Sequence, residues 1–196
     1  GFQQTFINAS VYLDPAKLDK NGNRDPADLA KVSTFGYTPL IQQAVFKEIE
    51  ENGIETPLAK PGDMKAMISA SAAAQVRNSV LDNPDLIGQT VEYRILASSR
   101  VDGYLKGRVF RKDLERDKNI DAEHLDIVDA LVSLGIVEKT FNWDFITGAD
   151  ASESRAEAAG LGVSMIGSFF MMLVVLFLSL PIGVAASIYL EEFAPK

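Results

Sequence analysis

Apolar and polar residues alternate along three stretches of this chain. In the first, Thr5 to Leu13, the residues that would share one face of a strand are Ile7, Ala9, Val11 and Leu13. Because successive side chains of a strand point to opposite faces, the pattern predicts a sheet with one buried side. Asp14-Pro15 should end this strand. Thr90 to Ala97 has the β-branched and aromatic content of a second strand.

The third alternating stretch follows Gly135. Apolar residues occupy every second position, with one interruption at Lys139, and they are Val137, Phe141, Trp143 and Phe145. We interpret this stretch as a half-buried strand.

Other stretches carry apolar residues at helical spacing. A first helix should begin at Thr38-Pro39, with proline in its first turn, and stop at Asn52-Gly53. A second should run from just after Asp63 to about Asp82, and Asn83-Pro84 should close it. Its early methionines are expected to fill the core rather than to line a partner groove.

A third helix is expected from Asp121 to Gly135. The residues that should face inward are Leu125, Val128, Leu131 and Val132. His124, the single histidine, would lie in the first turn and be exposed.

No Asp, Glu, Lys, Arg or His occurs between Ala158 and Leu190. About 20 apolar residues suffice for a helix to cross a hydrocarbon layer roughly 30 Å thick, so we predict a transmembrane helix rather than a buried core helix. Pro181 should kink it near Phe177 by removing one helical hydrogen bond. Gly183 and Ser187 would let another helix approach closely, which favours a bundle.

The composition excludes several classes of function. The net charge of −8 argues against binding to nucleic acid or anionic lipid, and the absence of cysteine excludes disulfides and thiol chemistry. A single histidine rules out two-histidine metal motifs. No nucleophile–base pair or phosphate loop emerges, so we expect no enzyme activity, no catalytic or metal-binding residue and no cofactor, and the residues that would bind a substrate stay unassigned.

Three weaker signals have ordinary explanations. Oxygen-bearing side chains recur at every second position in Asp19–Asp25, but Arg24 and Ala30 stand where a calcium loop needs glycine and glutamate, so a plain turn is favoured. The carboxylate pairs Asp126 with Asp129 and Glu50 with Glu51 are typical of solvated helix faces.

A basic cluster able to meet an oxyanion is the third signal. Its members would be Arg94, Arg100, Lys106 and Arg108. Acidic residues dilute it, and a solvated loop is the favoured interpretation.

These elements predict an α+β extramembranous domain, residues 1–157, whose last part, 147–157, is a flexible lead-in. A transmembrane helix region follows at 158–190, and 191–196 begin a truncated cytoplasmic loop. The start at Gly1 and the end at Lys196 suggest a piece of a longer protein.

The helix region resembles the first core helix of the binding-protein-dependent ABC permeases. The segments that carry this resemblance are Gly167-Ser168, Leu180-Pro181-Ile182-Gly183 and Ala186–Pro195. The preceding domain is similar to the extra N-terminal domain of the longer members of the PstA family of phosphate permeases. Its matching segments are Val11–Pro15, Asp85–Gly88, Ala97–Ser99, Val101–Gly107 and Phe141–Trp143.

This resemblance implies a permease subunit of a phosphate importer in the bacterial inner membrane, with residues 1–157 in the periplasm. The implied partners are a second permease subunit (PstC), an ATPase subunit (PstB) and a periplasmic phosphate-binding protein (PstS). ATP hydrolysis would belong to the separate ATPase. The loop with which such permeases engage their ATPase has no counterpart in these residues. The alternative is a membrane-anchored periplasmic sensory or binding domain.

Overall fold

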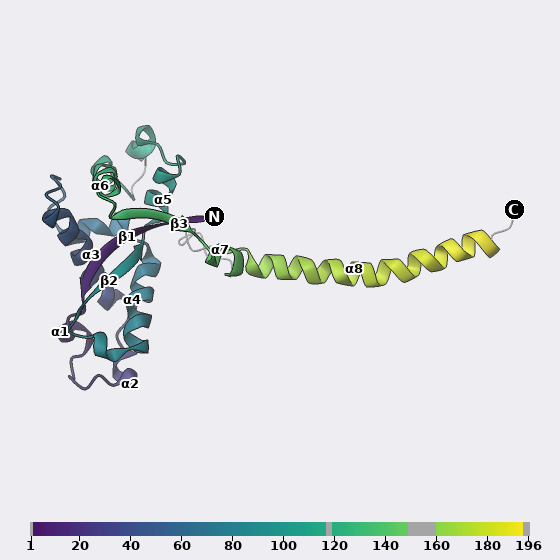
Figure 1. Cartoon of the computed structure of the whole chain (residues 1–196), viewed down its shortest axis with the longest axis horizontal. Coiled ribbons are helices and arrows are strands. Elements are labelled where there is room, and N and C mark those ends of the chain that lie inside the picture. The colour runs from purple at the N-terminus through teal and green to yellow at the C-terminus, as the bar shows by residue number, and fades with distance from the viewer. Residues whose placement is uncertain (1, 117–118, 149–159, 194–196) are drawn as a thin grey trace.

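The computed structural model describes residues 2–116, 119–148 and 160–193, and it combines a small α+β domain with one long C-terminal helix (Figure 1). Three antiparallel strands form a sheet in the order β2-β1-β3. They are β1 (Gln3–Tyr12), β2 (Thr90–Leu96) and β3 (Val137–Phe141). The predicted fold class is therefore confirmed at this level: an α+β domain followed by one apolar helix.

The central strand β1 owes its position to its alternating pattern. Ile7, Ala9 and Val11 are buried on one face, and Leu13 just after the strand is buried with them, as predicted. The register pairs Ile7 with both Ile95 of β2 and Val137 of β3, so apolar side chains meet across all three strands. Asp14 follows the strand and caps the short helix α1 (Pro15–Leu18). Its side chain accepts a hydrogen bond from the Ala16 amide.

Two helices pack on the buried side of the sheet (Figure 1). They are α3 (Thr34–Glu51), which contacts β1, and α4 (Ala70–Asp82), which contacts both α3 and β2. The short helix α2 (Pro26–Leu29) precedes α3, and η2 (Pro84–Leu86), a 3-10 turn, follows α4. Gly53, at φ +64°, follows the C-cap of α3 and ends the helix where Asn52-Gly53 predicted.

The start of α3 differs from the prediction. The helix begins at Thr34, one turn before the expected Thr38-Pro39, so Pro39 lies inside it. Pro39 cannot donate a bond to the carbonyl of Phe35, four residues back, and this one lost bond is tolerated near the exposed helix start. The buried side chains of Tyr37, Leu40 and Ile41 hold this turn against the core.

The predicted second helix is divided in two. A 3-10 helix, η1 (Pro61–Met67), precedes α4, and Ile68 between them forms an isolated bridge with Ala97. The Ser69 amide donates to the Leu96 carbonyl at 2.9 Å, and the Ser69 hydroxyl caps α4. Because the end of β2 takes these backbone bonds, a continuous helix cannot form here. Met64 and Met67 are fully buried, as expected.

The remaining elements of the domain follow β2 in the chain. They are α5 (Ser99–Leu105), the 3-10 helix η3 (Arg111–Arg116), α6 (Ala122–Ser133) and α7 (Asp144–Thr147). Leu125, Val128 and Leu131 of α6 are buried as predicted, but Val132 is 41% exposed. The segment 98–108 was expected to be a solvated loop; instead Ser98 caps α5, whose Val101 is fully buried.

The third strand is shorter than predicted. β3 ends at Phe141, and Trp143 and Phe145 lie beyond it. The Asn142 side chain accepts a bond from the Phe145 amide at 3.1 Å, which starts α7 and turns the chain. Phe141 and Trp143 are exposed instead of half-buried in a strand. Most of the predicted lead-in 147–157 lies outside the described residues.

Helix α8 (Gly162–Ile188) extends away from the domain and continues into one π-helical turn, η5 (Tyr189–Phe193) (Figure 1).

Candidate functional site

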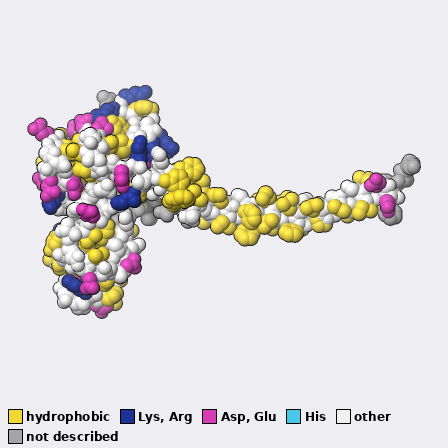
Figure 2. Space-filling view, viewed as in Figure 1, with side chains coloured by type: hydrophobic (Ala, Val, Ile, Leu, Met, Phe, Trp, Pro, Cys, Tyr) yellow, Lys and Arg dark blue, Asp and Glu magenta, His cyan; other side chains and the backbone are white. Residues whose placement is uncertain are grey.

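Helix α8 is the dominant apolar feature of the described chain. Together with the first residues of η5 it forms one continuous stretch, Gly162–Glu192, and none of its most apolar part is buried by the rest of the protein. Its 27 residues rise about 40 Å, which exceeds a hydrocarbon thickness of roughly 30 Å. Figure 2 shows hydrophobic side chains along its whole visible face. The helix is long and apolar enough to cross a membrane.

Pro181 lies within this helix, and the helix continues through it. Gly183, two residues later, has no neighbouring atom within 4 Å of the position that a Cβ would take. A small residue on an uncovered helix leaves room for a second helix to approach closely.

The first turn of α8 is attached to the domain through α7. The Leu161 amide donates to the Phe145 carbonyl at 2.7 Å, and the Gly162 amide donates to the Gly148 carbonyl at 2.9 Å. A Cβ at Gly162 would lie 2.5 Å from the Thr147 carbonyl oxygen, so only glycine permits this close approach. The domain and the start of α8 are thus in direct backbone contact.

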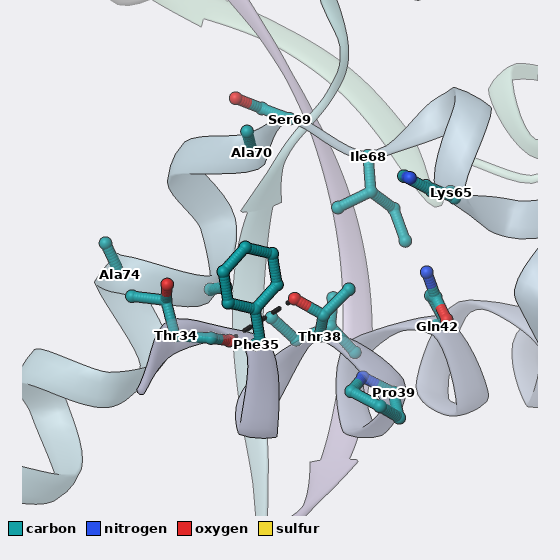
Figure 3. A pocket seen from close by; sticks show the side chains of 12 residues that line it. Thr34, Phe35, Thr38, Pro39, Gln42, Lys65, Ile68, Ser69, Ala70 and Ala74 are labelled. Carbon is teal, nitrogen blue, oxygen red and sulfur yellow. Dashed lines mark hydrogen bonds between the residues drawn. The ribbon is translucent and has the colours of Figure 1, made fainter. Parts of the chain in front are cut away.

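A pocket of about 650 Å³ lies between α3 and α4 (Figure 3). Its walls are mostly apolar, and Lys65 is the one charged residue among those that line it. Thr38 already donates to the Thr34 carbonyl at 3.3 Å, and the Ser69 hydroxyl caps α4. The pocket therefore offers a mostly apolar contact surface with a few hydroxyl groups along its walls.

The basic cluster that Arg94, Arg100, Lys106 and Arg108 could have made, which was not the favoured interpretation, does not assemble. Arg94 stacks over Phe6, 4.5 Å from the ring centroid, and pairs with Glu138 at 3.0 Å on the outer side of the sheet. Lys106 instead points to the α5–β1 junction, where it pairs with Asp102 at 2.6 Å. Arg100 and Arg108 are exposed on and after α5. These four side chains therefore do not form one oxyanion site.

The carboxylate pair Asp126 and Asp129 is exposed, as expected, but Arg111 joins the two side chains. The Arg111 guanidinium donates to one oxygen of each carboxylate at 2.6 Å, and the Tyr104 hydroxyl also donates to Asp129 at 2.8 Å. The bonds that Arg111 donates to Asp126, to the Tyr104 hydroxyl and to Asp129 raise its pKa, and the bond to Asp126 contributes most. Arg111 follows α5 by several residues, and no sequence pattern indicated that it would reach α6. The arrangement ties η3 to α6.

His124 was expected to be exposed, and this prediction is wrong. The side chain is only 5% exposed, and its Nδ1 accepts a bond from the Asp121 amide at 3.2 Å. Nδ1 is therefore unprotonated, and Nε2 carries the proton that it donates to the Asp63 carbonyl at 2.9 Å. The Nδ1 bond closes the first turn of α6, and the Nε2 bond joins that turn to η1.

The segment Asp19–Asp25 forms a turn, as predicted. The Asn21 and Asn23 amides both donate to Asp28, at 3.1 and 2.9 Å. These bonds, together with the Lys31 ammonium, which contributes most, hold the pKa of Asp28 well below its usual range. Within residues 2–116, 119–148 and 160–193, no three His, Cys, Asp or Glu side chains are grouped so that they could hold a metal ion.

Comparison with known proteins identifies one family. Residues 1–115 match the family described as "Domain of unknown function (DUF3333)", and the match spans more than half of the 196 residues. It covers the elements from β1 to most of η3. No curated protein and no solved structure matches the chain.

Proposed function

We propose that this chain, which belongs to the DUF3333 family, forms part of the permease subunit of a phosphate ABC importer. The observation that carries the proposal is α8, an uncovered apolar helix that contains the permease-like segment Leu180–Gly183. The domain in front of the helix resembles the one found in the longer PstA permeases, which narrows the substrate to phosphate. In this function α8 lies in the bacterial inner membrane and the domain lies in the periplasm.

In this proposal the chain contributes part of a pathway and conformational coupling, and a separate ATPase subunit hydrolyses ATP. A second permease subunit would pack against α8, and the open surface at Gly183 suits such a neighbour. The domain would contact the periplasmic binding protein or stabilise the pair of permease subunits. Its acidic surface repels a free phosphate ion, which favours contact with protein over direct capture of phosphate.

The test is uptake of radiolabelled phosphate by cells that lack the gene encoding this chain. The intact gene should restore uptake of phosphate and leave uptake of sulfate unchanged. Gly183→Leu should abolish the rescue because the added side chain fills the surface where a second helix would pack. Val184→Leu adds one methylene on the next residue, whose side chain is exposed, and should retain the rescue.

Unchanged phosphate uptake in the deleted strain would refute the permease function. It would leave the alternative, a membrane-anchored sensory or binding domain, for which α8 would be only an anchor. Equal rescue by Gly183→Leu and the intact gene would refute the packing role of this face, provided that the variant is present in the membrane at the same level.

A further inference from the structure

Four aromatic rings gather where the domain meets α8. Phe2, one residue before β1, lies 5.0 Å from Phe145 of α7 and 6.4 Å from Phe141 of β3, measured between ring centroids. The Phe141 ring lies 4.8 Å from that of Trp143. We call these four residues the aromatic cluster. In Figure 2 hydrophobic side chains gather at the same end of the domain, beside the start of α8.

Three of the four rings in the aromatic cluster are exposed to solvent, and the fourth, that of Phe145, is half-buried. Phe2 is 60% exposed, Phe141 49% and Trp143 70%, although the domain has a well-filled core that buries many large side chains. Scattered exposed apolar residues are ordinary, whereas adjoining exposed aromatic rings usually mark a surface that binds something.

Backbone contacts fix the position of the aromatic cluster relative to α8. Phe145 provides one of its rings, and the Phe145 carbonyl accepts the Leu161 amide one residue before α8 begins. The Asn142 amide donates to the Phe2 carbonyl at 2.8 Å, which ties the start of β1 to the same corner. The aromatic cluster therefore lies level with the first turn of α8.

That level corresponds to a membrane interface if α8 spans the bilayer. The helix is about 10 Å longer than the hydrocarbon layer, so its first turn lies near the headgroups. Aromatic side chains, tryptophan above all, are enriched at this depth, because the ring is apolar and the indole N–H can bond to water or headgroups.

We propose that the aromatic cluster inserts into the headgroup region of the bilayer and seats the domain against the membrane. This inference rests on the membrane span in the proposed function but adds a lipid-binding surface on the domain itself. The occupant is the lipid that surrounds α8, because the backbone contacts place the cluster beside the start of that helix.

The test uses Trp143, the only tryptophan in the chain, as its own probe. The full chain is reconstituted into phosphatidylcholine vesicles in which part of the lipid carries bromine, a fluorescence quencher, near either end of the acyl chain. We expect Trp143 to lose fluorescence in both, with the larger loss from bromine near the headgroup.

Two matched variants move the single tryptophan in a Trp143→Phe background. Tyr12→Trp places it at the other end of β1, about 30 Å from Phe2 by the rise of a strand, at a residue that is 52% exposed. This variant should not be quenched. Phe177→Trp places it near the middle of α8 and should be quenched most by bromine near the end of the chain.

The outcomes separate the two proposals. If Phe177→Trp is quenched and Trp143 is not, α8 lies in the bilayer but the aromatic cluster does not contact lipid, and the proposed lipid contact is overturned. Equal quenching of Trp143 and Tyr12→Trp would also overturn the contact proposed for this corner. If Phe177→Trp is not quenched, the membrane span fails, and the lipid contact fails with it.

Discussion

Replacing Tyr37 with phenylalanine should stabilise the domain. Tyr37 of α3 is completely buried, and its hydroxyl oxygen has no hydrogen-bond partner within the described part of the chain. A buried polar group without a partner costs about 1–3 kcal/mol relative to its hydrated state in the unfolded chain. Burial also raises the pKa of Tyr37 above its ordinary value of 10.0, against a smaller opposing effect of Arg77.

The magnitude follows from two opposing terms. Tyr37→Phe removes the desolvation cost and leaves a void of roughly 10 Å³, which costs about 0.2 kcal/mol at about 24 cal/mol per Å³. We therefore expect the free energy of unfolding to rise by about 0.8–2.8 kcal/mol at neutral pH.

Tyr93→Phe is the matched control because it also removes a tyrosine hydroxyl, but one that makes a hydrogen bond. The Tyr93 hydroxyl lies 2.6 Å from the Ser79 hydroxyl, so its loss should cost about 0.5–1.5 kcal/mol. The two Tyr→Phe substitutions should thus shift stability in opposite directions.

The assay is urea unfolding of the full chain in mild detergent, followed by near-UV circular dichroism, which reports the packing of aromatic side chains in the domain. A linear dependence on urea gives the free energies. If Tyr37→Phe lowers the free energy of unfolding at neutral pH, the hydroxyl has a stabilising partner, such as a bound water, and the reasoning is refuted.

The pH dependence gives a second check with a definite sign. Because the folded pKa of Tyr37 is raised, the folded chain retains this proton above pH 10 while the unfolded chain loses it. Ionisation of Tyr37 therefore does not affect the free energy of unfolding below pH 10 and lowers it as the pH rises above 10. The advantage of Tyr37→Phe over the natural chain should therefore grow above pH 10, by at most about 1.4 kcal/mol per pH unit.

Three further predictions concern His124, Gly135 and Asp28. His124→Ala should lower the free energy of unfolding by about 2–3 kcal/mol in the same urea assay, because it removes the bonds of the buried ring to the Asp121 amide and the Asp63 carbonyl and opens a cavity; an unchanged value would contradict the bridging role. Gly135→Ala should lower the free energy of unfolding by about 1 kcal/mol because Gly135 has φ +74°. The control, Gly62→Ala, should be nearly neutral because Gly62 has no positive φ and no atom within 4 Å of the added Cβ. Equal effects would rule out backbone strain as the cause. The pKa of Asp28 is lowered, mainly by Lys31, so the contribution of Asp28 to stability is present above the ordinary pKa of 3.8 and is lost as the pH falls below that value. Asp28→Asn should therefore flatten the acid limb of the plot of stability against pH. An unaltered acid limb would argue against the ion pair in solution.

Local sequence patterns were sufficient to predict the elements whose form depends mainly on their own residues. The alternation from Thr5 to Leu13 determined both β1 and its buried face, and the uncharged run determined α8. The ends at Asp14-Pro15, Asn52-Gly53 and Asn83-Pro84 were also correct, because caps and turns depend on the backbone preferences of a few neighbouring residues.

The errors arise where a distant segment competes for the backbone or encloses a side chain. The break at Ile68 exists because β2 offers hydrogen-bond partners to Ser69, and nothing near Ser69 in the sequence reveals them. His124 is buried because the Asp63 carbonyl, 61 residues away in the chain, faces its ring. The contact of Arg111 with α6 depends on tertiary structure in the same way.

The aromatic residues after β3 show a different limit of sequence patterns. Alternation identifies side chains that avoid water, but it is the same whether the apolar face meets a protein core or a lipid surface. Val137 meets the core, whereas Phe141 and Trp143, on the continuation of the same pattern, do not. What distinguishes them is their position beside the first turn of α8, which only the folded chain provides. The pattern identified these residues as apolar but not what they contact, and we propose that they contact lipid rather than the core.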